Sequence, residues 1–340
     1  MNTRSLPLTE LVTLTYIGAL ILALSLMGCQ TDTPLETDTP SVVETTQAPR
    51  PMPAPAPETA PDLGFEIVST PIPAEPQIVT YEEAEAAYRT GDFVFAQELF
   101  TDYVDRRPDN PFGHYMLGLS SHKAGDLETA ETSLRAAIDL DSTHVRSWQN
   151  LTRVLLDTQR PDEALITLEK SRALDPENAV SYRLLGRALH QTGNTIEAAD
   201  AYREAILIDD HDAWAMNNLA LILLEEKRPI QAAETLARAS ALRPSQSLFF
   251  NNLGMALEQA GQFASARDAY AEAVSLQPGY ERAESNLGRL ESSELIDMER
   301  IDLGEFAARF EQEIETWRDE HVARELGEED ESIADVANIQ

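Results

Sequence analysis

The chain has 340 residues, of which 26 are lysine or arginine and 59 are aspartate or glutamate, so its formal net charge is −33 at pH 7. This excess of negative charge excludes a protein that coats nucleic-acid phosphates, because such binding depends on clustered basic side chains. Hydrophobic residues make up 43% of the chain, enough for a sizeable core, and the lone cysteine, Cys29, excludes an internal disulfide and a cysteine-rich zinc site.

Residues 1–28 have the pattern of an export signal. Arg4 precedes the uncharged, largely apolar stretch 11–28, which ends at Cys29. The run Leu26-Met27-Gly28-Cys29 resembles the lipobox of bacterial lipoproteins. That resemblance implies cleavage before Cys29, lipidation of Cys29 and, with Gln30 following it, a place on the periplasmic side of the outer membrane. An uncleaved inner-membrane anchor stays open as the alternative, because the apolar stretch just reaches spanning length.

Residues 29–76 read as a tether behind the lipidated cysteine. The stretch 31–76 holds 11 of the 19 prolines, with threonine, alanine and glutamate between them. This composition cannot bury enough apolar surface to offset the entropy of ordering, so it predicts a disordered, extended spacer. An inert linker is the preferred interpretation, and a ligand for proline-binding domains is the alternative.

The middle of the chain repeats every 34 residues. One register holds alanine in six successive copies: Ala96, Ala130, Ala164, Ala198, Ala232 and Ala266. Within a copy such as 247–280, apolar residues recur at steps of three and four, which predicts two amphipathic helices. Gly261 suits the turn between them, and Pro278 ends the second helix. One hairpin cannot bury its own apolar surface, so neighbouring copies must stack.

These features resemble the tetratricopeptide repeat, which has a period of 34, Leu-Gly in its first helix and alanine in its second. Six copies cover 77–280, and the segment 281–296, with Leu287-Gly288, fits a capping helix. The resemblance implies an all-α, right-handed superhelix whose first helices line a groove.

Asparagines recur at two neighbouring groove positions that the family pattern implies. They are Asn150, Asn217, Asn218, Asn251, Asn252 and Asn286. An amide both donates and accepts hydrogen bonds, so the series predicts binding to a peptide backbone. It resembles the asparagine ladder in the tetratricopeptide segment of O-linked glycosyltransferases. Simple solvation of common repeat residues is the alternative.

Arginines gather on the same predicted face in copies three and four. They are Arg146, Arg153, Arg183 and Arg187, with Asp157 as the only acidic companion at these positions. Because guanidinium groups suit carboxylates, the cluster predicts an acidic segment or a peptide C-terminus as ligand. Pairing with the chain's own acidic side chains is the alternative. Apolar anchors for a ligand are expected from Trp214, Tyr115, Phe112 and Met255.

No catalytic constellation or cofactor motif emerges, so we expect no enzyme activity and no cofactor. The run Asp209-Asp210-His211-Asp212 resembles a metal site, but it falls on a connection between repeats, where short acidic residues cap helices. We therefore expect no metal there.

The C-terminal part, 297–340, is expected to hold an acidic amphipathic helix and a loose tail. Apolar side chains recur at helical spacing from Leu303 to Trp317, and 281–340 carries 6 basic and 19 acidic residues. The helix is expected to dock on the end or the groove of the solenoid, with a dimer partner or another protein as the alternatives. An acidic tail beside groove arginines would also permit self-inhibition, which is a hypothesis.

Together these patterns predict a lipid-anchored adaptor that binds extended peptides or partner proteins in the cell envelope. The chain resembles tetratricopeptide lipoproteins of pilus biogenesis and adaptors of peptidoglycan hydrolases, which implies a role in assembling an envelope or pilus machine. An accessory arm of a glycosyltransferase or protease system and a purely structural scaffold are the alternatives.

Overall fold

The computed structural model describes residues 79–292 and 300–337, with side chains up to Arg324. The expected signal, Cys29 and the tether lie outside these residues. The described parts are helical throughout and belong to two compact units, Met1–Arg107 and Pro108–Gln340. None of the described helices combines the length and the apolar character that a membrane crossing requires.

The described part of the first unit is one helical hairpin, α2 (Tyr81–Arg89) and α3 (Phe93–Arg106). Thr80 and Glu83 form a reciprocal capping box that fixes the start of α2. The Tyr81 ring packs edge-on against Phe100 at 5.6 Å, between ring centroids. The first of the six predicted copies therefore folds as a hairpin.

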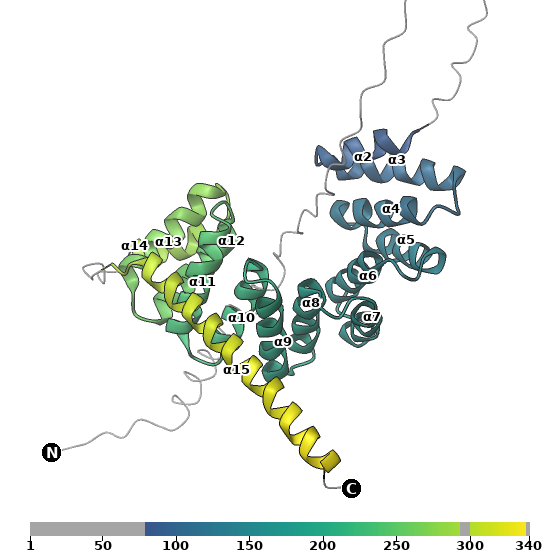
Figure 1. Cartoon of the computed structure of the whole chain (residues 1–340). Helices are drawn as coiled ribbons and strands as arrows, with labels where there is room; N and C mark the ends of the chain where they lie inside the picture. The colour runs from purple at the N-terminus through teal and green to yellow at the C-terminus, as the bar shows by residue number, and fades with distance from the viewer. Residues whose placement is uncertain (1–78, 293–299, 338–340) are drawn as a thin grey trace, which may run out of the picture. The chain divides into compact units, whose positions relative to one another are not determined.

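The second unit continues with five further hairpins, a single helix and a long C-terminal helix (Figure 1). We call α4, α6, α8, α10, α12 and α14 the first helices, and α5, α7, α9, α11 and α13 the second helices. The first helices are α4 (Pro111–Ala124), α6 (Val145–Asp157), α8 (Ala179–Gln191), α10 (Ala213–Glu225), α12 (Ser247–Gln259) and α14 (Glu281–Glu291). The second helices are α5 (Leu127–Leu140), α7 (Pro161–Leu174), α9 (Thr195–Ile208), α11 (Pro229–Leu242) and α13 (Phe263–Leu276).

Short polar residues and prolines set the helix boundaries. The side chains of Asn110, Asp126 and Asp212 accept hydrogen bonds from backbone N–H groups in the first turns of α4, α5 and α10. Pro176 and Pro244 follow the last residues of α7 and α11 by two positions. The sequence therefore specifies where these helices begin and end.

The turn inside each hairpin needs a left-handed residue. Gly193 and Gly261 take this conformation with φ of +85° and +78°. In copies three and five, where glycine is missing, Gln159 and Lys227 adopt it instead, with φ of +57° and +59°. The turn is therefore imposed by packing of the flanking helices even where the local sequence disfavours it.

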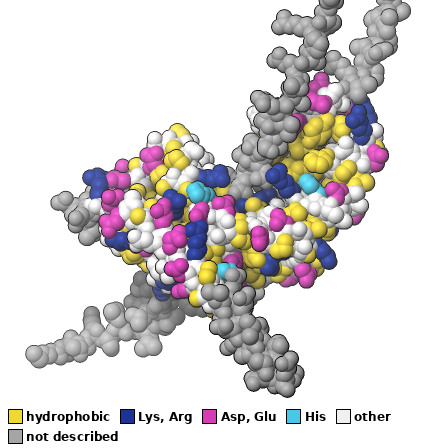
Figure 2. Space-filling view, in the orientation of Figure 1, with side chains coloured by type: hydrophobic (Ala, Val, Ile, Leu, Met, Phe, Trp, Pro, Cys, Tyr) yellow, Lys and Arg dark blue, Asp and Glu magenta, His cyan; other side chains and the backbone are white. Residues whose placement is uncertain are grey.

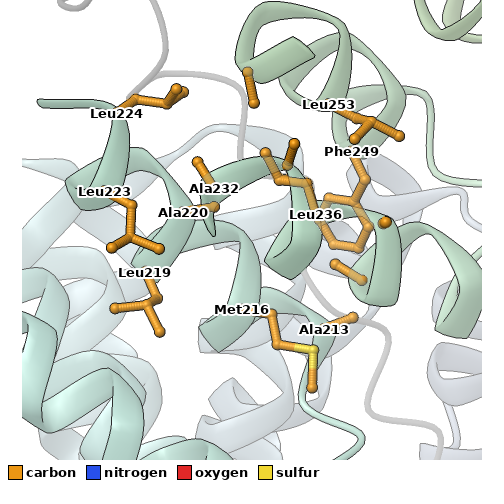
Figure 3. Close-up of a cluster of buried hydrophobic side chains, with 14 of the residues drawn as sticks. Ala213, Met216, Leu219, Ala220, Leu223, Leu224, Ala232, Leu236, Phe249 and Leu253 are labelled. Carbon is orange, nitrogen blue, oxygen red and sulfur yellow. The ribbon is translucent and has the colours of Figure 1, made fainter. Parts of the chain in front are cut away.

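In each hairpin the core lies between the two helices, and within the second unit it also lies between neighbouring hairpins. All six register alanines predicted from the 34-residue period have no exposed surface. A Cβ added to Gly254 would lie 2.6 Å from ring atoms of Tyr270, so α12 and α13 approach too closely for any side chain there. Figure 3 shows the resulting cluster around α10 and α11, where Met216, Leu219 and Leu236 are among the labelled buried residues.

The predicted capping segment is helical as α14, which ends at Glu291 and buries Ala283 and Leu290. Residues 293–299 lie outside the described parts of the chain.

The C-terminal helix α15 spans Leu303–Ala337. It continues through much of the segment expected to be loose, which is rich in glutamate and alanine and has no proline to stop a helix. It packs chiefly on α11 and also on α9, so it lies against second helices, whereas we expected the solenoid end or the groove (Figure 1).

Candidate partner-binding surface

The face formed by the first helices of copies two to four is basic in an otherwise acidic chain. Consecutive helices α4, α6 and α8 contact one another, and together they hold five basic residues and one acidic residue. The second helices of the same copies, α5, α7 and α9, hold four basic and nine acidic residues. Charge is thus segregated between the two helix layers.

Two of the predicted arginines, both on α6, stay accessible. Arg146 is exposed, and Arg153 is half-buried and donates to the Asn150 side chain at 2.8 Å. The Asn150 amide in turn donates to the backbone oxygen of Arg146 at 2.8 Å. Asn150 therefore orients Arg153 on the first-helix face.

Arg183 has an intramolecular partner. Its Nε lies 2.8 Å from the Asp212 carboxylate, and both residues are buried. Asp212 also accepts hydrogen bonds from the backbone N–H groups of Trp214 and Ala215, which begin α10. This pair joins α8 to the start of α10.

Arg187 belongs to a series of polar contacts across three first helices. Its guanidinium contacts Asp157 on α6 at 2.5 Å, and His122 on α4 lies 2.6 Å from the other oxygen of the same carboxylate. Burial alone would raise the pKa of Asp157, but the hydrogen bonds from His122 and Arg187 outweigh it and hold the pKa below its ordinary value. The cluster keeps its only acidic member ionised.

A second histidine bridge occupies the same repeat positions two copies later. His190 on α8 lies 3.0 Å from the Glu225 carboxylate on α10, and both bridges join residues 35 positions apart. We did not predict either histidine from the sequence, although His122 and His190 lie 68 residues apart, which is twice the repeat period. This spacing is the signal that could have identified them.

The predicted asparagines of copies five, six and the cap form one hydrogen-bonded series, which we call the amide ladder. Asn286 donates to Asn251, Asn251 to Asn252, Asn252 to Asn217 and Asn217 to Asn218, over 2.8–3.2 Å. Asn217, Asn251 and Asn252 are almost fully buried. The ladder joins α10, α12 and α14, and Asn150 lies apart from it on α6.

The expected apolar anchors differ in exposure. Phe112 is exposed and Met255 is half-buried, whereas Trp214 and Tyr115 are buried. The Trp214 ring packs edge-on against Phe249 at 4.9 Å, between centroids. Phe112 and Met255 therefore offer more surface to a ligand than Trp214 does.

The metal-like run lies at the connection between copies four and five. Ligand atoms of Asp209, Asp210 and His211 lie within 4.8 Å of one another. Asp210 already pairs with His211 and with Arg318 of α15, and the hydrogen bond from Arg318 lowers its pKa. These contacts give the cluster a structural role.

Matches to protein-family models identify the repeat that builds this architecture. Three models described as the tetratricopeptide repeat match the chain, one at 121–189, one at 81–144 and again at 217–281, and one at 179–212. The matched segments cover more than half of the chain. The protein is a tetratricopeptide-repeat protein. Repeats of this family form scaffolds for protein–protein interaction, and the fold is generally non-catalytic.

Solved structures agree with this fold. The tetratricopeptide-repeat chain resembles one from the Cut9–Hcn1 hetero-tetramer of the APC/C, with a TM-score of 0.55 and 16% identity over 61% of this chain. It spans only 41% of that chain's length. A tetratricopeptide repeat protein from Parabacteroides merdae also gives 0.55, with 12% identity over 62% of this chain and 82% of the other.

A third similar structure, pilF of Pseudomonas aeruginosa, has a TM-score of 0.48 and 24% identity over 53% of this chain and 82% of the other. Identities this low establish the fold alone. No curated protein matches the chain.

Proposed function

We propose that this tetratricopeptide-repeat protein is an adaptor that binds an extended acidic peptide, or the acidic C-terminus of a partner protein, on the first-helix face of α4, α6 and α8. The adaptor is anchored in the cell envelope through a lipid on Cys29. The observation that supports the ligand class most strongly is the segregation of charge between first and second helices of copies two to four.

The four predicted arginines of this face have two different roles. Arg183 and Arg187 are engaged with Asp212 and Asp157 and hold the helices in place. Arg146 is exposed, and Arg153, seven residues further along α6, is oriented by a hydrogen bond to Asn150. A carboxylate arriving at Arg146 and Arg153 would gain charge-assisted, planar hydrogen bonds.

Binding of a fluorescein-labelled ten-residue peptide rich in glutamate, with a free C-terminal carboxylate, tests this ligand class. The double variant Arg146→Glu/Arg153→Glu is expected to weaken binding at least about tenfold, since it reverses two charges at the site. Fluorescence anisotropy measures the affinity, and raised salt is expected to weaken binding to the unchanged protein.

Lys170→Glu is the matched control, because Lys170 is an exposed basic residue on the second helix α7. Lys170→Glu changes the charge as much as each single substitution of the double variant does, but away from the proposed surface. It is expected to leave the affinity for the peptide unchanged. Equal affinity of the double variant and the unchanged protein would contradict the proposal. Equal weakening by Lys170→Glu would point to net charge alone.

The anchor has its own test. Mass spectrometry of the mature protein from bacterial membranes is expected to find Cys29 as the first residue, carrying acyl chains. An unmodified Cys29 would overturn the lipid anchor without affecting the peptide site. The further proposal that the adaptor serves in assembling an envelope or pilus machine rests on the sequence resemblance alone.

A further inference from the structure

The C-terminal helix α15 is held on the second helices by an apolar stripe. Phe310 and Ile314 are 1% and 3% exposed, and Phe306 and Ala307 are also buried. They join the same core cluster as residues of α9, α11 and α13. The Trp317 ring packs edge-on against Phe310 at 5.6 Å and lies beneath the guanidinium of Arg203 on α9.

Three arginines spaced nine residues apart tie this segment to three successive copies. Arg300 contacts Asp268 on α13 at 2.5 Å, Arg309 contacts Glu234 on α11 at 3.3 Å, and Arg318 contacts Asp210 after α9 at 2.6 Å. Nine residues of α-helix advance about 13.5 Å. Along α15 this advance leads from Arg309 at α11 to Arg318 at the residue Asp210 after α9, and Arg300 lies three residues before α15 begins.

Further contacts follow the same order along the chain. The Ile301 backbone N–H donates to Ser265 on α13, Glu311 pairs with Arg238 on α11 at 2.6 Å, and His321 lies 3.9 Å from Glu204 on α9. Figure 2 shows acidic and basic side chains mixed over the visible surface where these helices lie. The match between the spacing of the three arginines and the order of the copies argues against a tail that merely covers one apolar patch.

From these contacts we infer that residues 300–324, made up of α15 and the three residues before it, form a splint that holds copies four, five and six at fixed spacing. In repeat solenoids each repeat otherwise contacts only its neighbours, so a segment that bridges three of them couples repeats that the fold leaves independent. The amide ladder joins α10, α12 and α14 on the first helices of the same region. The ion pairs that join this segment to the solenoid lie in copies four, five and six.

The splint gives the first-helix face two parts of different stiffness. The amide ladder and the splint hold the asparagine part from both layers. In the arginine part, α4 and α6 lie outside the copies that the splint joins and are expected to adjust their spacing to a ligand more readily. Only this last step rests on the proposed peptide site; the splint itself rests on contacts within the chain.

Hydrogen exchange of the full chain without any ligand tests the splint, so its failure is distinguishable from failure of the proposed function. The triple variant Arg300→Glu/Arg309→Glu/Arg318→Glu is expected to exchange at least about tenfold faster in α9, α11 and α13, while α5 and α7 stay unchanged. Arg324→Glu is the matched control, because Arg324 is an exposed arginine of the same helix.

Two results would overturn the splint: unchanged exchange in the triple variant, or faster exchange confined to α11. Should the triple variant fail to fold, the exchange of charges in Arg309→Glu/Glu234→Arg provides the second measurement. The splint predicts that Arg309→Glu alone raises exchange in both α9 and α13, and that adding Glu234→Arg restores it. Absence of this rescue would count against the splint.

Discussion

At the scale of single residues, partners decide what each arginine on the first-helix face does. Arg183 and Arg146 belong to the same predicted cluster and differ only in their surroundings. Arg183 is buried against Asp212, whereas Arg146 is exposed and makes no ion pair within the described parts of the chain. Removing a buried partner leaves an uncompensated charge, which costs far more than removing an exposed one.

Replacing Arg183 is therefore expected to destabilise the protein strongly. Arg183→Met should lower the free energy of unfolding by about 3 kcal/mol, because Asp212 would stay buried without its cation. Arg146→Met should change it by less than about 0.5 kcal/mol. Urea denaturation at pH 7 measures both. A loss of unfolding free energy for Arg183→Met as small as that for Arg146→Met would show that the pair of Arg183 and Asp212 does not stabilise the fold.

The sequence allowed prediction of which residues share a face, and not of which ones pair. Arg183 and Asp212 are 29 residues apart, and Asp157 and Arg187 are 30 apart. Such pairs depend on the stagger between neighbouring hairpins, which a 34-residue period does not specify. For the same reason the asparagines were recognised as a series, whereas their hydrogen bonds to one another were not expected.

At the scale of helices, glycines at one repeat position illustrate how packing distance depends on the partner. Gly254 on α12 faces Tyr270 of α13, and a Cβ there would lie 2.6 Å from the ring. Gly288 occupies the same position in α14, and a Cβ there would meet nothing within 4 Å. The next described helix, α15, packs chiefly on α11.

Alanine at these two positions should have opposite effects. Gly254→Ala is expected to lower the free energy of unfolding by about 1–3 kcal/mol, because the core must shift to admit the methyl group. Gly288→Ala is expected to raise it by about 0.5–1 kcal/mol, since alanine favours helix. Denaturant titration of both variants measures the difference. A stable Gly254→Ala protein would contradict the close approach of α12 and α13.

On α15, the carboxyl group of Glu313 lies in surroundings that disfavour its charged form. Burial raises the pKa of Glu313, and the nearby Glu234 raises it further. A raised pKa means that folding favours the neutral form. The contribution of Glu313 to stability is therefore greatest below its ordinary pKa of about 4.3 and is lost as pH rises through its folded value.

Glu313→Gln is accordingly expected to raise the melting temperature at pH 7 and to leave it nearly unchanged at about pH 3.5, where the glutamate is protonated in both states. Calorimetry at the two pH values measures the shift. A melting temperature raised equally at both would show that ionisation of Glu313 is not the cause.

At the scale of the whole molecule, the 34-residue period predicted the six hairpins and the capping helix because each copy carries its own core residues and turn. The period did not predict where α15 docks. An amphipathic stripe indicates that one face of a helix is buried, but it does not indicate which surface buries it. The net charge of −33 also proved uneven: the first helices α4, α6 and α8 are basic, and the second helices beside them are acidic.

The central claim is that the basic first helices form the partner-binding surface. Hydrogen exchange of the full chain with and without a saturating glutamate-rich peptide tests it most directly. The proposal predicts slower exchange in α6 and α8 when the peptide is bound, with the second helices α5 and α7 unchanged. Protection that appears in α5 and α7 instead, or no protection anywhere, would contradict it.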